Sequence, residues 1–376
     1  MQVDRLLELV RAELGMDAAL IGRIHAGCRT VAYAAGAGIA QGVVEPLEAT
    51  YCGLISNGTL QPVVPDTGAV PEVADLPITA RLGIASHVGV PLTLSDGSLY
   101  GTLCAYSSHV RHDLSAADVR LCRLVGRLVA ERLEADIAEE RRLAAMTVNV
   151  RAALSSGDPM TMVQPIVNLE TREPIGFEVL SRFMSAPHRT PDAWFADAAT
   201  VGLGIDLELQ ALRNGLAATR SLPAECYLSL NASTALTADG GLVKLIEGAG
   251  GRPLVIEITE HSQDEVWLRP AIDRLRDLGC RVAVDDVGAG YSGISRLLAL
   301  LPDIVKLDRN VVADVDRDVA RQALVAAAVS YCDATGVQLI AEGVETETEA
   351  AALASLGINF IQGFLTGPPR RPEAPT

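Results

Sequence analysis

The sequence predicts an α/β protein: a (β/α)8 barrel with one antiparallel strand, preceded by a smaller α+β domain and a long connecting helix. Three patterns lead to this fold class. In residues 156–376, apolar runs of strand length alternate with amphipathic helical segments, as they do in α/β barrels. In residues 1–114, a helix, short strands and a hairpin follow one another. In residues 115–155, the apolar residues keep a helical spacing.

The composition argues against several classes of function. The chain has 376 residues, which suits two domains, and 49% of them are hydrophobic. The formal net charge of −16 argues against a nucleic acid or an anionic membrane as partner. No apolar run is long enough to cross a membrane, and the first residues form a charged amphipathic helix rather than a signal peptide. The seven cysteines are scattered without a CxxC pair, so we expect a cytoplasmic protein with reduced thiols.

The N-terminal segment, residues 1–114, predicts an α+β module. Its clearest strands are Ser86–Leu94 and Leu99–Ser107, and the turn residues Ser95–Ser98 between them indicate a hairpin. The stretch 86–107, SHVGVPLTLSDGSLYGTLCAYS, resembles the hairpin of GAF domains. That resemblance implies a pocket for a small-molecule effector, which the sequence does not identify, or a role in dimerisation.

Four histidines of this segment are candidate haem ligands: His25, His87, His109 and His112. An isolated histidine on such a sheet is more often a surface or core residue than a ligand. We therefore expect ordinary surface or core histidines at these positions.

Residues 115–155 predict one long helix or two abutting helices. Ser115 and Asp118 have the spacing of a capping box, and apolar residues recur from Val119 to Val150 with charged residues on the other faces. A long helix with a narrow apolar stripe usually packs against a partner helix. We therefore predict a signalling helix in a homodimer, and a helix that lies on its own domain is the alternative.

Residues 156–376 predict a TIM-like barrel. Its expected strands are 162–168, 174–180, 226–231, 253–258, 281–286, 303–307, 337–341 and 358–361. Only the short segment Glu170–Glu173 separates the first two strands, and a parallel crossover needs a longer connection. These two strands should therefore form a hairpin, which makes one strand antiparallel to the rest.

Seven successive apolar runs each end in polar residues. These are Glu178, Asn231, Glu257, Asp285 with Asp286, Lys306, Glu342 and Gln362. In a barrel, the carboxyl ends of the strands meet at one rim, where the chemistry is carried out. Carboxylate and amide oxygens are ligands of Mg²⁺ or Mn²⁺, and two such ions about 4 Å apart suit the hydrolysis of a phosphodiester. Lys306 would orient the nucleophile or balance charge, and Arg182 is placed to contact a phosphate.

At these residues the second half of the chain resembles an EAL domain, over about residues 156–370. The signature tripeptide is Glu178-Val179-Leu180, in the run QPIVNLETREPIGFEVLSRF. The further motifs are YLSLNAS, IEITE, VAVDDVGAGYSGI, IVKLD, IAEGVET and IQGF. The resemblance implies hydrolysis of cyclic di-GMP to linear pGpG, with two Mg²⁺ or Mn²⁺ ions in each active site.

The resemblance also assigns roles to single residues. It implies a metal-binding set of Glu178, Asn231, Glu257, Asp285, Asp286 and Glu342. It implies catalytic roles for Lys306, Glu342, Glu178 and Asp285. It implies substrate contacts from Gln164, Arg182, Gln362 and Glu345. Glu260 would stabilise the loop that follows the aspartates. Whether Glu342 or Lys306 accepts the proton stays open.

The chain departs from the family pattern in two places. Val179 replaces the signature alanine, which leaves the metal ligands untouched. The common family form of the loop after the aspartates is DDFGTGYSSL, and this chain differs there at Val287, Ala289, Gly293 and Ile294. We expect reduced or regulated basal activity. The alternative is a catalytically weak or inactive domain that binds cyclic di-GMP as an effector protein, and the complete ligand set favours the enzyme.

The predicted division of the chain has three parts. Residues 1–114 form a GAF-like sensory domain, residues 115–155 a helical signalling linker and residues 156–376 the phosphodiesterase barrel. Effector binding to the first part would act through the linker on the loop that follows the aspartates.

Overall fold

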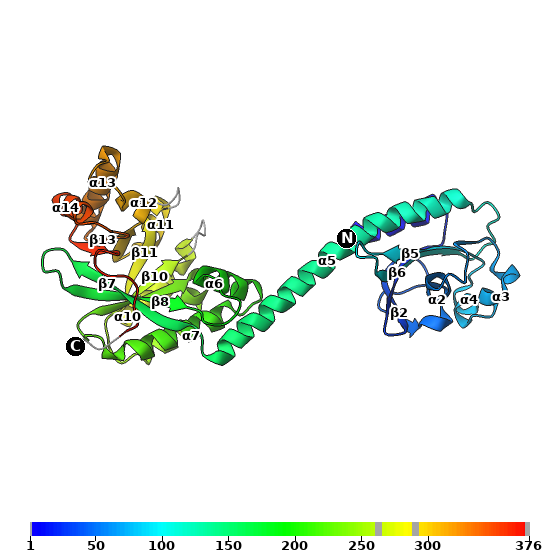
Figure 1. Ribbon diagram of the computed structural model, residues 1–376, viewed down its shortest axis with the longest axis horizontal. Helices are drawn as coiled ribbons and strands as arrows, with labels where there is room; N and C mark the ends of the chain where they lie inside the picture. The colour runs from blue at the N-terminus through cyan, green and yellow to red at the C-terminus, as the bar shows by residue number, and fades with distance from the viewer. Residues whose placement is uncertain (1, 260–264, 288–292, 373–376) are drawn as a thin grey trace. The chain divides into compact units, whose positions relative to one another are not determined.

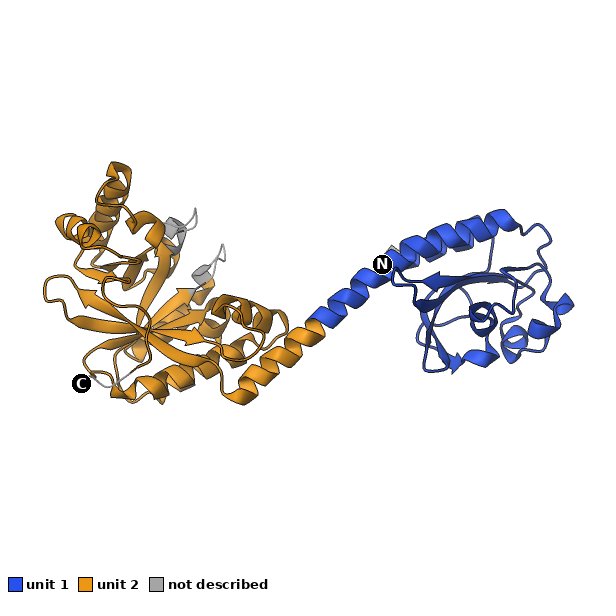
Figure 2. Ribbon diagram, in the orientation of Figure 1, with its two compact units in different colours: residues 1–142 blue, residues 143–376 orange. Residues whose placement is uncertain are grey.

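The computed structural model describes residues 2–259, 265–287 and 293–372. The chain divides into two compact units, Met1–Arg142 and Leu143–Thr376, which Figure 2 shows in different colours. The division falls inside one helix, α5 (Ala116–Ser156), so this helix contributes residues to both units. The limits predicted for the linker, 115–155, stay predictions.

The first unit is built on an antiparallel sheet with the strand order β3-β2-β1-β6-β5-β4. Its strands are β1 (Ala18–His25), β2 (Cys28–Gly36), β3 (Val44–Pro46), β4 (Val63–Val64), β5 (Ser86–Thr93) and β6 (Leu99–Ser107). Its helices besides α5 are α1 (Gln2–Glu13), α2 (Tyr51–Ser56), α3 (Pro71–Ala74) and α4 (Pro77–Leu82), with 3-10 turns at Leu47–Ala49 and Thr67–Ala69. β5 and β6 pair as a hairpin, so the predicted α+β module is confirmed (Figure 1).

Helices cover both faces of this sheet because side chains alternate along each strand. On one face, α1 and the first half of α5 pack on residues such as Ile21 and Leu103. On the other face, α2, α3 and α4 pack on residues such as Leu20 and Cys104. The sheet is therefore the middle of three layers.

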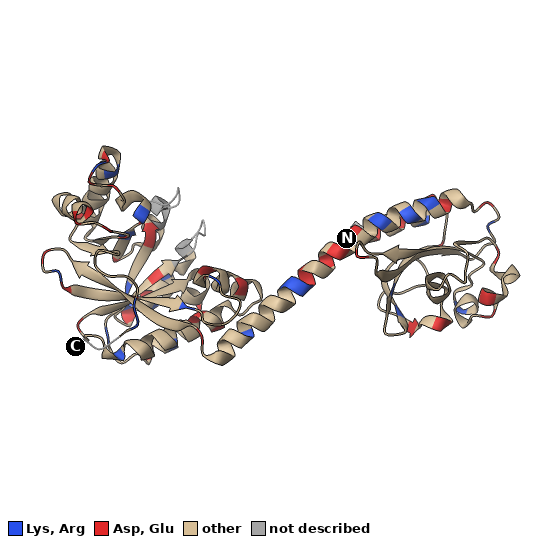
Figure 3. Ribbon diagram, in the orientation of Figure 1, with Lys and Arg blue, Asp and Glu red and all other residues tan. Residues whose placement is uncertain are grey.

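The helix α5 is continuous over 41 residues. Val119, Val125 and Leu133 are buried against the sheet of the first unit, so this part of the apolar stripe follows the alternative interpretation, a helix lying on its own domain. Near the other end, Val150 and Ala153 join the core of the second unit. Charged residues of both signs occupy the middle of the helix (Figure 3), where Arg132 pairs with Asp136 at 2.8 Å and Arg142 pairs with Glu139 at 2.8 Å.

The second unit is a closed barrel with the strand order β10-β11-β12-β13-β14-β7-β8-β9. The strands are β7 (Met160–Asn168), β8 (Pro174–Arg182), β9 (Tyr227–Ser233), β10 (Leu254–Thr259), β11 (Arg281–Val287), β12 (Ile304–Leu307), β13 (Gln338–Ala341) and β14 (Phe360–Gln362). β7 pairs antiparallel with both β8 and β14, and the other neighbouring pairs are parallel. The predicted barrel with one antiparallel strand is confirmed.

Helices surround the barrel on its outside. They are α6 (Pro191–Thr200), α7 (Gly204–Ala218), α8 (Thr234–Ala238), α9 (Gly240–Glu247), α10 (Arg269–Asp277), α11 (Gly293–Leu300), α12 (Arg309–Val312), α13 (Val319–Thr335) and α14 (Glu347–Ser355), with 3-10 turns at Thr219–Ser221 and Glu265–Leu268. Their apolar faces pack on outward-facing strand residues such as Leu230 and Val282. In the part of the chain that the structure describes, no helix is long and apolar enough to span a membrane.

An apolar layer fills the interior of the barrel. It consists of Ile166, Tyr227, Val255, Ala283, Ile304 and Ile340. Gly176 on β8 makes room for the ring of Tyr227 on β9, since a Cβ atom at Gly176 would lie 2.6 Å from ring atoms. This layer is the floor on which the polar site stands.

Candidate metal centre

The strand register brings the predicted polar residues into one level of the barrel. Gln164 on β7 lies opposite Glu178 on β8, and Asn231 on β9 lies opposite Glu257 on β10. Gln164, Asn231 and Glu257 lie an even number of positions along their strands from residues of the apolar interior layer, so they point inward like that layer. Glu178 lies two positions from Gly176, which is opposite the interior residue Tyr227, so it points inward too. On β12, Lys306 follows the interior residue Ile304 by two positions.

Glu342 and Gln362 reach the same level from the last two strands. Lys306 lies opposite Ile340 on β13, and Ile340 lies opposite Phe360 on β14. Glu342 follows Ile340 by two positions and Gln362 follows Phe360 by two, so both lie one step above the interior layer. The strand-end residues predicted from the sequence therefore lie together at one end of the barrel, although they belong to different strands.

A break in β11 brings the two neighbouring aspartates together. The pairing of β11 with β12 is irregular between Val284 and Val287. Asp286 has a left-handed backbone with φ of 55°, which aspartate adopts more readily than most residues. The backbone N–H of Asp286 donates a hydrogen bond of 3.0 Å to Asp285 Oδ1. This local geometry lets adjacent side chains, which point to opposite faces in a regular strand, serve one site.

Lys306 is the centre of the charge arrangement. Its ammonium group is buried, and Nζ lies 2.9 Å from Glu257 Oε1 and 3.4 Å from Glu178 Oε2. The same nitrogen lies 3.5 Å from Asp285 Oδ1 and forms an ion pair with Glu342. One buried cation therefore faces four carboxylates.

An amide chain holds Glu178. Asn231 Nδ2 donates to Glu178 Oε1 at 3.1 Å, and Gln362 Nε2 donates to Glu178 Oε2 at 2.5 Å. Gln362 Nε2 also donates to Gln164 Oε1 at 3.1 Å, and Gln164 Nε2 donates to the carbonyl oxygen of Gly367 at 3.1 Å. Because both amide groups use their nitrogens on Glu178, the carbonyl oxygens of Asn231 and Gln362 are left as ligand atoms.

The pKa values record an excess of negative charge. Burial raises the pKa of Glu257 to about 8 and raises that of Glu342 well above its usual value, and neighbouring carboxylates add to both shifts. Burial, with Asp285 and Asp308, raises the pKa of Asp286 to about 6. Burial lowers the pKa of Lys306, but its four carboxylates together outweigh this and hold that pKa well above the usual value. Carboxylates this close stay ionised together only when more cations join them.

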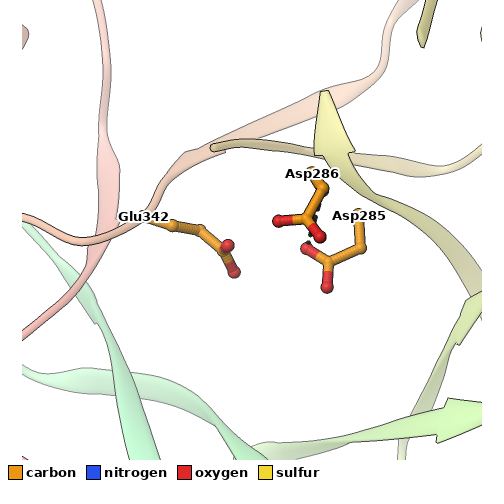
Figure 4. Close-up of side chains that lie close together, drawn as sticks. All are labelled: Asp285, Asp286 and Glu342. Atoms are coloured by element: carbon orange, nitrogen blue, oxygen red, sulfur yellow. Dashed lines mark hydrogen bonds between the residues drawn. The ribbon is translucent and has the colours of Figure 1, made fainter. Parts of the chain in front are cut away.

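The residues fit divalent cations. Asp285, Asp286 and Glu342 each offer a carboxylate oxygen, and these atoms lie within 4.8 Å of one another (Figure 4). Among the residues that the structure describes, two buried oxygens close by, Glu257 Oε2 and Gln362 Oε1, have no hydrogen-bond partner. Buried oxygens without partners are costly unless a further group satisfies them. An all-oxygen donor set of this kind suits Mg²⁺ or Mn²⁺.

Three predicted residues are not placed in this cluster. Glu345 forms an ion pair of 2.7 Å with Arg309 at the surface. Arg182 ends β8, and its Nη1 donates to the carbonyl oxygen of Ser181 at 2.7 Å. Glu260 lies outside the described residues, as does Ala289 in the loop where the chain departs from the family pattern.

The structure adds two residues that the sequence interpretation missed. Ser229 Oγ donates to Glu257 Oε1 at 2.5 Å, and Asp308 forms a side-chain hydrogen bond with Asp286. Ser229 lies two positions before Asn231 on β9, and side chains two positions apart share a strand face. This spacing is a signal that could have identified Ser229. Asp308 lies just past the end of β12, at the N-cap of α12.

The comparisons with known proteins agree with this arrangement. A model of the EAL domain matches residues 147–369, which is more than half of the chain. The chain belongs to the EAL domain family. A model of the GAF domain matches residues 2–133, so a GAF domain precedes the EAL domain. EAL phosphodiesterases depend on divalent metals, generally Mg²⁺ or Mn²⁺.

One curated relative is a probable phosphodiesterase. This EAL protein is 29% identical over 237 residues to the probable cyclic di-GMP phosphodiesterase PdeA of Escherichia coli K12, a match that covers 59% of this chain and 32% of PdeA. The chain spans about a third of the length of the curated relatives it matches first.

Two solved structures are similar to this protein. The PaMucR phosphodiesterase in complex with c-di-GMP is 29% identical, with a TM-score of 0.53, and the match covers 60% of this chain and 97% of that one. The EAL enzyme Bd1971 in its cGMP-bound form is 21% identical, with a TM-score of 0.55, and the match covers 94% of this chain and 90% of that one. At this identity, the likeness to Bd1971 shows a shared fold alone.

Proposed function

We propose that the EAL barrel hydrolyses cyclic di-GMP to linear pGpG with two divalent cations, Mg²⁺ or Mn²⁺. The observation that carries this proposal is the set of carboxylate and amide oxygens around buried Lys306, with more negative charge than one lysine balances. The similarity to phosphodiesterases of cyclic di-GMP supports the choice of substrate.

The residues divide between two cation positions. Glu178, Asn231, Glu257 and Asp285 would hold one ion, and Asp286 with Glu342 would reach the second. When bound, the pair of ions would supply activation of a water molecule and neutralisation of charge at phosphorus.

The chain's own residues would position the reactants. Lys306 would stay charged among its carboxylates and stabilise negative charge that develops on the phosphate. Because Lys306 stays protonated, the carboxylate of its ion-pair partner Glu342 would take up the proton of the attacking water. Arg182 and Gln164 would contact the substrate, with Arg182 donating to a phosphate oxygen. Glu345 would lie at the edge of the substrate site, and Glu260 would stabilise the loop after β11.

The test is the rate of pGpG formation from cyclic di-GMP by the full chain with Mg²⁺ or Mn²⁺, measured by chromatography. We expect metal-dependent turnover that Glu178→Ala abolishes. Glu173→Ala is the matched control, because Glu173 is exposed just before the same strand, and it should keep the wild-type rate. Tight binding of cyclic di-GMP with no turnover at any metal concentration would instead assign the protein as a cyclic di-GMP-binding effector.

The GAF domain and α5 suggest how the enzyme is controlled. The proposal includes a small-molecule effector of the GAF domain, a homodimer formed through α5, and a cytoplasmic location. Leu124 and Leu128, one helical turn apart on α5, are 51% and 47% exposed. Exposed leucines at this spacing are suited to a contact with a second copy of the helix.

A further inference from the structure

The GAF domain contains two cysteine thiols that contact each other in its core. Cys52 lies on α2 and Cys104 lies on β6, on the sheet face that α2 covers. Both are free and buried in one core cluster, Cys104 Sγ donates a hydrogen bond of 3.4 Å to Thr102 Oγ1, and each thiol shifts the pKa of the other. The proposed phosphodiesterase reaction has no use for either thiol.

The sheet under α2 makes room for both sulfur atoms. Gly22 on β1 and Gly89 on β5 flank β6. A Cβ atom at Gly22 would lie 2.8 Å from Cys52 Sγ, and a Cβ atom at Gly89 would lie 3.2 Å from Cys104 Sγ. A larger residue at Gly22 would displace Cys52 Sγ, and one at Gly89 would clash with Ile55 Cδ1 and crowd Cys104 Sγ.

Both thiols also line a small cavity. Its volume is about 20 Å³, and Arg29, Tyr51 and His87 are among the other residues in its wall. A cavity needs roughly 10–15 Å³ on this measure to hold one water molecule. The space therefore admits a molecule little larger than water and excludes a bulky reagent.

We propose that Cys52 and Cys104 form an oxidisable dithiol, which a small hydroperoxide converts to a disulfide that joins α2 to β6. The two thiols line one cavity on elements that pack together, so a small movement would bring them to bonding geometry.

The environment selects Cys52 as the nucleophile. The neighbouring Cys104 thiol is the main cause that lowers the pKa of Cys52, and Thr102 and the buried guanidinium of Arg29 add to it; together they outweigh burial and bring this pKa to about 7. The hydrogen bond to Cys52, together with burial, raises the pKa of Cys104. The thiolate is the reactive form of cysteine.

The reaction balances with one molecule of hydrogen peroxide. The Cys52 thiolate attacks one peroxide oxygen, the O–O bond breaks, and the departing oxygen takes a proton and leaves as water. The Cys104 thiol then attacks the sulfur of the sulfenic acid on Cys52, the S–S bond forms, and the sulfenic oxygen leaves as a second water with the Cys104 proton. The two thiols lose two electrons and the hydrogen peroxide gains them.

Cys122 is a matched control within the same unit. It lies on α5 and is buried, as Cys52 and Cys104 are, but it packs in the core on the opposite face of the sheet. Burial raises its pKa to about 12. It should stay reduced under conditions that oxidise Cys52 and Cys104.

Peptide mapping of the full chain tests the proposal. The reduced protein is treated with hydrogen peroxide, unfolded with an alkylating reagent and digested, and the peptides are identified by mass spectrometry. We expect a linked pair of peptides containing Cys52 and Cys104, lighter by two hydrogen atoms, with Cys122 alkylated. Alkylation of both Cys52 and Cys104 while another cysteine is oxidised would overturn the proposal. The wild-type protein suffices for this result, so a variant that fails to fold does not affect it.

Two further arms test the mechanism. In Cys104→Ser, Cys52 should proceed to the sulfinic acid and gain two oxygen atoms, whereas Cys122→Ser should form the disulfide at the wild-type rate. The second arm compares two oxidants by the ratio of the oxidation rate with cumene hydroperoxide to the rate with hydrogen peroxide. This ratio should be at least about tenfold lower for the protein than for free cysteine, because the cavity excludes the larger molecule. Equal ratios would contradict access through the cavity.

Discussion

Lys306 shows how one side chain determines the state of the whole site. It is buried against four carboxylates, and losing one partner of a buried ionic cluster leaves the others uncompensated. Such a lysine stabilises the fold and keeps the carboxylates ready for cations at the same time. The site is therefore sensitive to charge rather than to shape alone.

Lys306→Met should lower the free energy of unfolding of the metal-free barrel by about 3–5 kcal/mol. Mg²⁺ should restore part of this loss, because added cations replace the missing positive charge. Lys244→Met is the control, since Lys244 is exposed on α9 and its removal should change stability by less than about 0.5 kcal/mol. Denaturant titrations with and without Mg²⁺ measure the effect, and equal losses for the two variants would contradict it.

His87 is the matching case in the GAF domain. It is fully buried, it stacks on Tyr51 at 4.5 Å between ring centroids, and within the described part of the chain its ring nitrogens have no hydrogen-bond partner. Burial lowers its pKa from 6.5 to about 3. His87 is thus a core residue, while His25, His109 and His112 are exposed, as expected for ordinary histidines.

This pKa makes stability depend on pH. Below about pH 6.5 His87 is protonated in the unfolded chain, whereas in the folded protein it stays neutral down to about pH 3. The free energy of unfolding therefore falls as the pH falls through this window. The loss is about 1.4 kcal/mol per pH unit, or about 2 kcal/mol at pH 5. Calorimetry of wild type and His87→Phe at pH 7 and pH 5 should show a smaller loss in the variant. The same loss in both proteins would rule out His87 as the cause.

At the scale of elements, the barrel strands place the site through their register. The inward positions of each strand alternate between the apolar floor and the polar level above it, and the irregularity in β11 adds a second aspartate. The floor is closely packed where β8 meets β9, because Gly176 lies against the ring of Tyr227. Substitutions in this apolar layer should therefore lower the free energy of unfolding more than they lower the rate of hydrolysis.

Gly176→Ala should destabilise the barrel by about 1–3 kcal/mol, the usual cost of overpacking a core. Its Cβ atom would lie 2.6 Å from the Tyr227 ring. The double variant with Tyr227→Leu should recover part of the loss. Gly240→Ala is the control, since a Cβ atom there meets nothing within 4 Å. Denaturant unfolding decides, and equal stability of the two single variants would contradict the account.

The helix α5 is the element whose role depends on a second copy of the chain. Leu128→Glu should shift the protein from dimer to monomer, because it places a charge where the proposed partner helix packs. Leu9→Glu is the matched control, since Leu9 on α1 is 48% exposed in the same unit. Light scattering measures the mass of each protein. A wild type that is already monomeric, or dimers in both variants, would contradict the dimer proposed through Leu124 and Leu128.

For the whole molecule, the sequence predicted the fold class and most of the polar level of the barrel. The strand-end residues were identifiable because each apolar run is short and its first polar residue ends it, as Glu178 and Lys306 illustrate. Ser229 was not identified, because it lies inside an apolar run and acts through Glu257. Glu345 pairs with Arg309 outside the metal cluster, and its contact with the substrate stays a prediction. Such side-chain partners depend on loop paths that periodicity does not encode.

The sequence could not predict which apolar residues of α5 are buried within the chain. Its apolar stripe predicts packing but does not say whether the partner is the chain's own sheet or another helix. The structure assigns Val119, Val125 and Leu133 to the sheet and leaves Leu124 and Leu128 exposed. The resemblance to two families came from motifs, while the contact between Cys52 and Cys104 required the fold that brings α2 onto β6.

The most direct test of the central claim is a count of the metal ions that the barrel binds. Mn²⁺ is titrated into the full chain with cyclic di-GMP in a Ca²⁺-free buffer, at a pH and temperature that slow turnover. Electron paramagnetic resonance then gives the number of bound Mn²⁺ ions per chain. We predict two bound ions for the wild type and a loss of at least one in Asp286→Asn. Free Mn²⁺ at every ratio up to millimolar concentrations, with nucleotide present, would contradict the assignment of this rim as a two-metal site.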